Sequence, residues 1–165
     1  MKATRTTSSR SGLSRIVIAD DHELARAGLR SMLASDRNLQ LVGEATNGQE
    51  AVQLCRQHQP DLAVLDVRMP EMDGLAATRS IKQQCPRTSV LIVTTHDHYD
   101  YLLAALKAGA AGYMLKDISR SELLTAVRRV LRGESILNGE LASRALQRLA
   151  SETSSYDGPP PQRLT

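Results

Sequence analysis

Short runs of apolar residues recur along the chain, separated by segments with a different pattern. Four of them are Ile16-Val17-Ile18-Ala19, Leu62-Ala63-Val64-Leu65, Val90-Leu91-Ile92-Val93 and Tyr113-Met114-Leu115. Continuous apolarity over so few residues is typical of strands that are buried on both faces of a sheet. A fifth run, residues 39–45, mixes polar and apolar positions. We expect this fifth run to form a strand near an edge of the sheet.

The segments between these runs carry apolar residues at helical spacing. The first stripe is Leu24, Gly28, Leu29, Met32 and Leu33, the last is Leu123, Leu124, Val127, Val130 and Leu131, and shorter ones lie within 51–55, 75–81 and 102–106. Asn47 with Glu50, and Ser119 with Glu122, resemble capping boxes at helix starts. A strand–helix unit repeated five times predicts an α/β fold in which helices cover both faces of a parallel sheet.

The pattern changes after Gly133. Asn138 is placed to cap a short helix over 138–150, and residues 151–161 are polar and end in three consecutive prolines, a linker composition. We therefore divide the chain into a disordered leader (1–14), a folded domain (15–133) and a helical, then proline-rich linker (134–165).

Composition narrows the classes of function. The 165 residues include 21 Lys+Arg and 18 Asp+Glu, a net charge of +3 that suggests a nucleic-acid partner. Residues 16–118, however, carry 10 basic and 13 acidic side chains, so the positive excess lies at the two ends. No apolar run reaches the roughly 18 residues of a membrane helix, and no secretory signal is evident. Two cysteines are too few for a disulfide framework, so we expect reduced thiols in a cytoplasmic protein.

Polar residues stand at the carboxyl ends of the four buried runs: Asp20-Asp21, Asp66, Thr94 and Lys116. In an open parallel α/β sheet these ends border the crevice where ligands bind, so we expect the five side chains to converge. Three adjacent carboxylates repel one another unless a cation joins them, and an all-oxygen cluster suits Mg²⁺. A hydroxyl and an ammonium opposite them would hold phosphoryl oxygens. The pattern thus predicts phosphoryl transfer with a carboxylate nucleophile.

Other interpretations fit less well. A single strand-end Asp is usually a cap or turn residue, but five polar residues at successive strand ends favour a site. His96-Asp97-His98 offers metal-ligand residue types without evident further ligands, and we interpret it as a solvated loop. A haloacid-dehalogenase-type phosphatase needs a second Asp where this chain has Arg68. A flavodoxin would flank its flavin with aromatics, and this chain has four Tyr and no Trp or Phe.

The chain resembles the response-regulator receiver family of bacterial two-component signalling. The segments that carry the resemblance are Asp20-Asp21-His22, Leu65-Asp66-Val67-Arg68-Met69-Pro70-Glu71-Met72-Asp73-Gly74, Val93-Thr94-Thr95 and Ala108-Gly109-Ala110-Ala111-Gly112-Tyr113-Met114-Leu115-Lys116. The resemblance covers about residues 15–133. It implies a flavodoxin-like (βα)5 fold, a doubly wound parallel sheet with strand order 2-1-3-4-5, followed here by a linker helix.

The resemblance also implies a role for the acidic residues. Asp66 would accept a phosphoryl group from the phosphohistidine of a sensor histidine kinase. Asp21, Asp66 and the backbone carbonyl of Arg68 would bind Mg²⁺ directly, while Asp20 would act largely through water. The protein would then not be an enzyme in the ordinary sense, because it would catalyse only its own phosphoryl transfer and hydrolysis at Asp66.

A switch is implied as well. Thr94 and Lys116 would contact the phosphoryl oxygens. Thr94 would move toward the phosphoryl group, and Tyr113 would swing inward to fill the vacated space, so that phosphorylation biases a two-state equilibrium. Arg68 and His96 would flank the phosphoryl group, and we expect their bulk and charge to tune the access of the water that hydrolyses it.

The sequence leaves two interpretations of what the protein does once it is phosphorylated. Lys116 is followed by Asp117, a pair typical of the NarL/LuxR class, whose receivers are joined through a helical linker to a C-terminal helix-turn-helix domain. That domain commonly opens with Leu-Thr, and this chain ends at Leu164-Thr165. We expect a transcription regulator that binds DNA only through a domain absent from this chain. The alternative is a stand-alone receiver that acts by protein contact or phosphorelay. A homodimer through the first and fifth helices is compatible with either.

Overall fold

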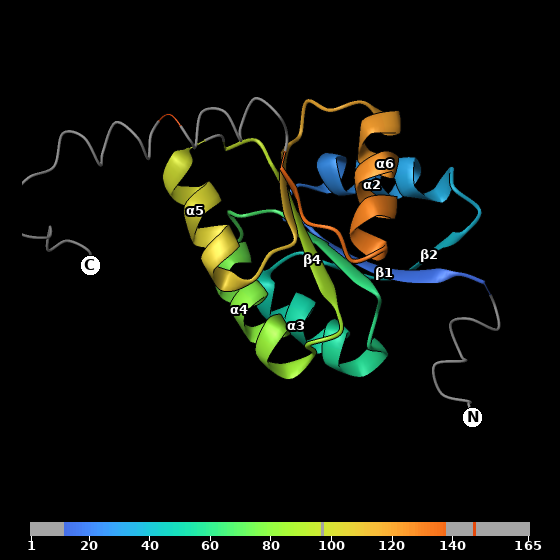
Figure 1. Ribbon diagram of the computed structural model, residues 1–165. Helices are drawn as coiled ribbons and strands as arrows, with labels where there is room; N and C mark the ends of the chain where they lie inside the picture. Colours follow the sequence, from blue (N-terminus) through green and yellow to red (C-terminus); the bar gives the residue numbers. More distant parts are fainter. Residues whose placement is uncertain (1–11, 97, 138–146, 148–165) are drawn as a thin grey trace, which may run out of the picture.

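Strands and helices alternate along the described part of the chain (Figure 1). The structure, a computed structural model, describes residues 12–96, 98–137 and 147. Its elements are β1 (Ser14–Ala19), α2 (Glu23–Ala34), β2 (Leu39–Ala45), α3 (Gly48–His58), β3 (Leu62–Leu65), α4 (Gly74–Gln84), β4 (Ser89–Thr94), α5 (Tyr99–Ala108), β5 (Gly112–Leu115), α6 (Arg120–Leu131) and β6 (Ile136–Leu137). The five predicted strands and their five helices are confirmed, and the mixed run is the outer strand β2.

The strands form one parallel sheet in the order β2-β1-β3-β4-β5-β6. The first five follow the flavodoxin-like order 2-1-3-4-5, as predicted. The sixth strand was not predicted, because two residues are too few to show a periodic pattern. Gly133, at φ +91°, ends the turn after α6, and Ile136 then pairs with Gly112 of β5. The sheet therefore extends beyond Gly133, where we expected the linker to begin.

Two apolar layers enclose the sheet. Figure 1 shows α2 and α6 on one face and α3, α4 and α5 on the other. Alternate residues of β1 contribute to the two layers. Val17 packs toward α3 and α4, and Ile18 packs toward α2 and α6. Both side chains are fully buried. This two-sided burial is the physical reason why the strand sequences read as continuous apolar runs.

Two leucines that we assigned to helix stripes are exposed. Leu24 is 86% exposed and Leu106 is 39% exposed, whereas Leu29 and Leu33 of α2 are buried. Leu24 lies five residues before Leu29, which places it about 140° around the helix from the buried face. The apolar character of Leu24 was therefore a wrong indicator of burial.

The predicted helix starts are largely confirmed. Ser119 and Glu122 form a full capping box at α6. The Asn47 side chain accepts the Glu50 N–H at 2.8 Å, but the Glu50 carboxylate accepts the N–H of Thr46 instead of that of Asn47. Of the predicted leader, the structure describes only residues 12–14, and Ser14 already belongs to β1, so the folded domain begins one residue earlier than predicted. The helix expected over 138–150 lies outside the described residues apart from position 147, and the proline segment lies outside them entirely.

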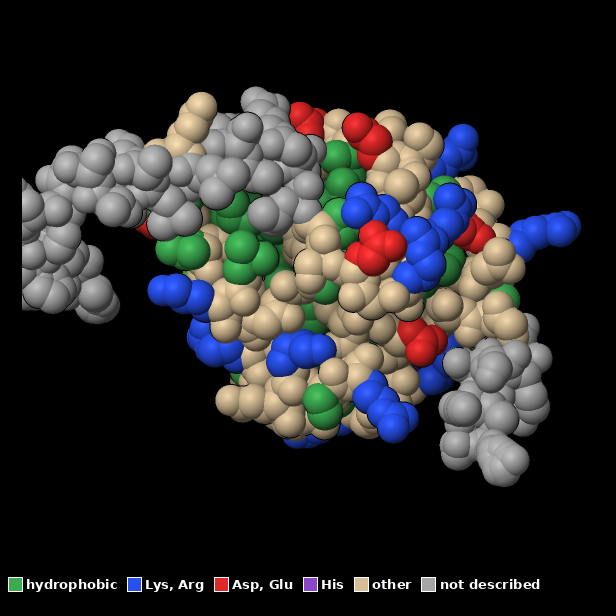
Figure 2. Space-filling view, viewed as in Figure 1, with side chains coloured by type: hydrophobic (Ala, Val, Ile, Leu, Met, Phe, Trp, Pro, Cys, Tyr) green, Lys and Arg blue, Asp and Glu red, His purple; other side chains and the backbone are tan. Residues whose placement is uncertain are grey.

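Charges on the described surface are partly neutralised by one another. Figure 2 shows Lys and Arg side chains, with interspersed acids, on the face that carries α6. Arg129 Nε lies 2.7 Å from a Glu134 carboxylate oxygen, and Arg128 pairs with the buried Asp36 at 3.2 Å. These pairs weaken the nucleic-acid interpretation of the positive net charge for this domain. No helix among the described residues is long and apolar enough to span a membrane.

Candidate functional site

The carboxyl end of β1 presents two adjacent acids. Asp20 is fully buried, and one of its carboxylate oxygens accepts the backbone N–H of His22 at 2.9 Å. Arg26, from the second turn of α2, donates to the Asp20 backbone carbonyl at 2.8 Å. The side chain of Asp21 is 32% exposed. The strand end thus holds one acid rigidly and leaves the next accessible.

Asp66 follows β3 and is 4% exposed. Its backbone N–H still bonds to Ala19 in β1 at 3.0 Å, and its Oδ1 accepts the N–H of Val67 at 2.7 Å. These two bonds fix both the main chain and the side chain. The carboxylate is therefore presented at the edge of the sheet in one orientation.

Two glycines hold the loop that follows Asp66. The N–H of Gly74 bonds to the Val67 carbonyl at 2.7 Å, and a Cβ at Gly74 would collide with the backbone carbonyl of Asp66. The N–H of Gly48, at the start of α3, bonds to the Met72 carbonyl at 2.8 Å, and a Cβ there would collide with that carbonyl. Close backbone approach explains why glycine stands at both positions. Sequence reasoning did not assign them this role.

Lys116 joins the two buried acids. Its Nζ lies 2.5 Å from Asp20 Oδ2 and 3.0 Å from Asp66 Oδ2. Partial burial alone would lower the pKa of Lys116, but the bonds to Asp20 and Asp66 outweigh this effect and raise the pKa above its ordinary value. Lys116 is therefore a charged ammonium at neutral pH. Among the described side chains, it lies within salt-bridge distance of both buried carboxylates.

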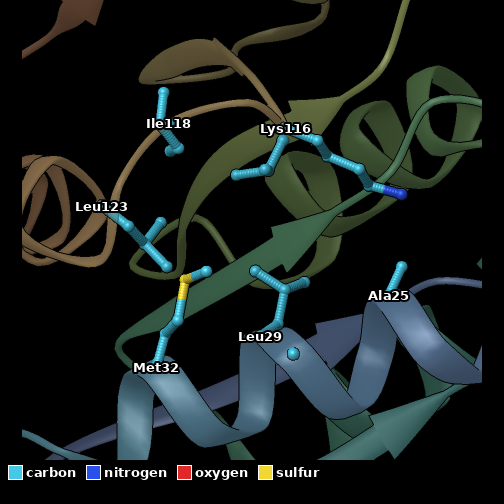
Figure 3. A pocket seen from close by; sticks show the side chains of 8 residues that line it. Ala25, Leu29, Met32, Lys116, Ile118 and Leu123 are labelled. Atoms are coloured by element: carbon cyan, nitrogen blue, oxygen red, sulfur yellow. The ribbon is translucent and has the colours of Figure 1, made fainter.

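The stem of Lys116 lines a separate apolar cavity of about 240 Å³ between α2 and α6. Figure 3 shows its amino end pointing away from the labelled apolar side chains of Leu29, Met32 and Leu123. The apolar wall supports the methylene groups of the lysine, while its charged end reaches the acids. Lys116 thus places its stem beside apolar side chains and its charged end beside the acids.

Thr94 and Tyr113 both form hydrogen bonds with the backbone of His96. Thr94 is fully buried at the end of β4, and its Oγ1 accepts the N–H of His96 at 3.3 Å. Tyr113 is also fully buried, and its hydroxyl donates to the carbonyl of His96 at 2.6 Å. The Lys116 N–H donates to the Thr94 carbonyl at 2.8 Å, so the ends of β4 and β5 are adjacent. Tyr113 therefore occupies the inward position in this structure.

The acidic residues form a group suited to a cation. Asp20, Asp21, His22 and Asp66 each offer one donor atom, and these four atoms lie within 4.8 Å of one another. Three carboxylates against the single ammonium of Lys116 leave a negative excess that a divalent cation would neutralise. Hard carboxylate oxygens are the donors that Mg²⁺ prefers. The residues present therefore fit the predicted ion.

The structure brings together most of the predicted site. Asp20, Asp21, Asp66 and Lys116 are neighbours, and His96 links Thr94 to Tyr113. Arg68 is exposed, two residues beyond Asp66. His22 was not among the predicted site residues, although its position directly after two acids was a usable signal. His98 packs its ring edge-on against Tyr101 and does not belong to the acidic group.

Comparison with known families identifies the matching domain. The profile described as "Response regulator receiver domain" matches residues 16–128. The chain is 38% identical over 138 residues to the uncharacterized transcriptional regulatory protein YhcZ of Bacillus subtilis, covering 84% of this chain and 64% of that protein. It is 37% identical over 140 residues to the oxygen regulatory protein NreC of Staphylococcus carnosus, with the same two coverages of 84% and 64%. The chain thus spans just under two thirds of the length of these relatives.

Solved structures of response regulators also resemble this chain. A two-component response regulator of the LuxR family from Aurantimonas sp. SI85-9A1 superposes with a TM-score of 0.79 at 32% identity, over 84% of this chain and 99% of that one. The signal receiver domain of the putative response regulator NarL from Mycobacterium tuberculosis gives a TM-score of 0.72 at 38% identity, over 74% and 98%. Both similarities cover nearly the whole of the solved chain and about three quarters or more of this one.

Proposed function

Because this chain belongs to the response regulator receiver domain family, we propose that Asp66 accepts a phosphoryl group from the phosphohistidine of a sensor histidine kinase. The observation that carries the proposal is the shared ammonium of Lys116, 2.5 Å from Asp20 and 3.0 Å from Asp66. A cation between two buried carboxylates is suited to hold the oxygens of an incoming phosphoryl group. The NarL/LuxR relatives point to the same class of signalling protein.

The transfer is a simple displacement at phosphorus. A carboxylate oxygen of Asp66 forms a bond to phosphorus as the P–N bond of the phosphohistidine breaks, and the electron pair of that bond returns to the imidazole. Lys116 and the Thr94 hydroxyl contact the phosphoryl oxygens and stabilise their charge. Hydrolysis reverses the state: water attacks phosphorus, the Asp66 carboxylate leaves, and inorganic phosphate is released. The protein catalyses only these steps on its own side chain.

A divalent cation, which we propose to be Mg²⁺, would be held by Asp21, Asp66 and the backbone carbonyl of Arg68, with Asp20 acting largely through water. When bound, it supplies positive charge that offsets the phosphoryl oxygens and the crowded carboxylates. Asp20 and Lys116 keep Asp66 oriented for attack. Arg68 and His96 flank the reacting group and tune the access of hydrolytic water.

Thr94 and Tyr113 convert the chemistry into a conformational signal. Thr94 moves toward the phosphoryl group, and Tyr113 fills the space behind it. The inward position of Tyr113, bonded to the His96 carbonyl, supports this assignment because it is the position that phosphorylation would favour. A full shift of such an equilibrium from 1:99 to 99:1 needs about 5.5 kcal/mol of differential stabilisation.

We propose that the output is control of transcription by a NarL/LuxR-type regulator that binds DNA through a C-terminal domain outside this chain. The relatives named above, which include a transcriptional regulatory protein and are longer than this chain, support this output. In this scheme residues 15–133 form the body of the receiver, to whose sheet Ser14 and β6 (Ile136–Leu137) also belong. The remaining residues up to 165 are a linker, and those before Ser14 are a leader. In this proposal the protein works in the cytoplasm, where a kinase and DNA are accessible, and a homodimer through α2 and α6 is compatible with either output. A stand-alone receiver is the alternative.

Mass spectrometry after incubation with Mg²⁺ and acetyl phosphate tests the phosphoacceptor. We expect one phosphoryl adduct on the wild-type chain and none on Asp66→Asn. Asp73→Asn is the matched control, because Asp73 caps α4 outside the site and Asn caps equally well. An adduct that survives Asp66→Asn would overturn the assignment.

The hydrolysis and output proposals have tests of their own. If the lifetime of the phosphorylated chain is unchanged by Arg68→Ala combined with His96→Ala, the tuning role fails. The coding sequence downstream of residue 165 distinguishes the outputs. A helix-turn-helix reading frame would support the transcription regulator, and a stop codon would favour the stand-alone receiver.

A further inference from the structure

His22 stands at the N-cap of α2 but does not cap the helix. Its side chain makes no capping hydrogen bond, although N-cap positions normally favour side chains that do. The ring instead turns toward the acids: its Nδ1 lies 3.2 Å from Asp21 Oδ1 and 3.5 Å from Asp20 Oδ1. The backbone N–H of His22 bonds to Asp20 at 2.9 Å, which ties the residue to the buried acid. The imidazole is therefore part of the acidic group and not of the helix terminus.

A nitrogen donor changes the metal chemistry of this group. Carboxylate oxygens alone suit hard ions such as Mg²⁺, whereas imidazole suits first-row transition ions. Ni²⁺ readily accepts an imidazole ligand whereas Mg²⁺ prefers oxygen ligands, so a comparison between the two ions reports on the nitrogen donor. The His22 side chain is 73% exposed, so the ring is accessible to an ion that enters from solvent.

We propose that His22 is a nitrogen ligand of the metal site and that it raises the affinity of the site for first-row divalent transition ions relative to Mg²⁺. The proposal rests on the metal site of the proposed function and adds a residue that sets its selectivity. Asp21 and Asp66 supply the hard oxygen ligands, and His22 supplies the one imidazole within the group. The ion that occupies the site would then depend on which divalent ions are available.

Calorimetric titration of the untagged full chain with NiCl₂ and, separately, with MgCl₂ tests this. His22→Gln replaces the imidazole nitrogen with a hard amide oxygen. We expect the variant to lose about tenfold or more in Ni²⁺ affinity, comparable to the loss of a partner that supports a metal ligand. Its Mg²⁺ affinity should change much less. A prior addition of excess Mg²⁺ should weaken Ni²⁺ binding to the wild-type chain, because the two ions compete for one site.

His98→Gln is the matched control, because His98 is an exposed histidine outside the acidic group. We expect its Ni²⁺ affinity to equal that of the wild type. An unchanged ratio of Ni²⁺ to Mg²⁺ affinity in His22→Gln would overturn the inference, and so would an equal loss in His98→Gln. If the wild-type chain bound no Mg²⁺ and Asp66 were not phosphorylated, the proposed function would fail instead. The two failures are therefore distinguishable.

Discussion

The hydroxyl of Tyr113 donates a 2.6 Å hydrogen bond to the backbone carbonyl of His96. The N–H of the same His96 lies 3.3 Å from Oγ1 of Thr94. The backbone of His96 therefore contacts both proposed switch residues, so a displacement of this backbone would change the hydrogen bonds of both. A movement of Thr94 at the end of β4 can therefore reach the ring of Tyr113, which fills the core below α5, through the backbone of His96.

Removal of the hydroxyl in Tyr113→Phe should destabilise the protein by about 1–2 kcal/mol. The ring still fills its buried space, but the carbonyl of His96 loses a short hydrogen bond. Urea denaturation should show a lower midpoint with an unchanged slope. Phosphorylation of Asp66 itself should persist in this variant, because the hydroxyl lies outside the acidic group. Loss of phosphorylation would contradict a role confined to the switch.

Replacement of the shared cation in Lys116→Met should lower the free energy of unfolding by about 3 kcal/mol at neutral pH, because two buried carboxylates lose their partner. Mg²⁺ should restore part of the stability, and more so than in the wild type. Exposed Lys107 supplies the control, Lys107→Met, with little effect. Equal urea midpoints for Lys116→Met and the wild type would show that the bridge contributes nothing.

The pH dependence of the Lys116 contribution has a definite sign. Its pKa is raised in the folded state, so the folded state holds this proton more tightly than the unfolded state does. The stabilisation is complete below the ordinary lysine pKa of 10.5 and is lost as pH rises through the raised value. Unfolding measured from pH 8 to 11 should therefore show a steeper alkaline loss in the wild type than in Lys116→Met.

Glycine substitutions should separate loop geometry from helix propensity. Gly74→Ala should destabilise by about 1–3 kcal/mol and impair phosphorylation, because its Cβ collides with the Asp66 carbonyl. Gly28→Ala should stabilise by up to about 1 kcal/mol, since a Cβ added there would meet nothing within 4 Å beyond its chain neighbours and its own helix backbone, and alanine favours a helix. Thermal unfolding compares the two. If Gly74→Ala left the thermal stability unchanged, the loop that follows Asp66 would have to shift freely to make room for the Cβ.

Burial, and not apolar character, should decide the effect of leucine substitutions in α2. Leu29→Ala should cost about 2–4 kcal/mol because Leu29 is 8% exposed in the core. Leu24→Gln should change stability by less than about 0.5 kcal/mol because Leu24 is 86% exposed. The two urea midpoints measure the difference. A large loss in Leu24→Gln would indicate that this surface is covered in solution.

The buried thiol of Cys55 should be unreactive in the folded protein. Burial raises its pKa from 9.0 to about 12, with a smaller contribution from nearby Cys85. The thiolate, which is the reactive form, is thus suppressed at pH 8. We expect alkylation of Cys55 only after unfolding in urea, as counted by mass spectrometry. Since the folded pKa is raised, this group also makes stability fall as pH rises from 9 toward 12, a slope that Cys55→Val should remove.

Much of the fold could be predicted because its signals are local. Burial on both faces makes each inner strand apolar throughout, and Ser119 with Glu122 marks a helix start within four residues. The polar residues at the strand ends were also visible, because parallel strands bring their carboxyl ends to one edge. Strand order and the roles of Asp66 and Thr94 came from the family resemblance.

Local sequence patterns were sufficient to locate five strands, five helices and the polar residues at one edge of the sheet. How those residues contact one another depends on the tertiary structure. Lys116 bonds to acids 96 and 50 positions away in the chain, and β6 closes the sheet with two residues. His22 turns toward the carboxylates while Leu24 turns to solvent. Such contacts depend on side-chain rotamers and packing between distant segments, which a local pattern of apolar and polar residues does not encode.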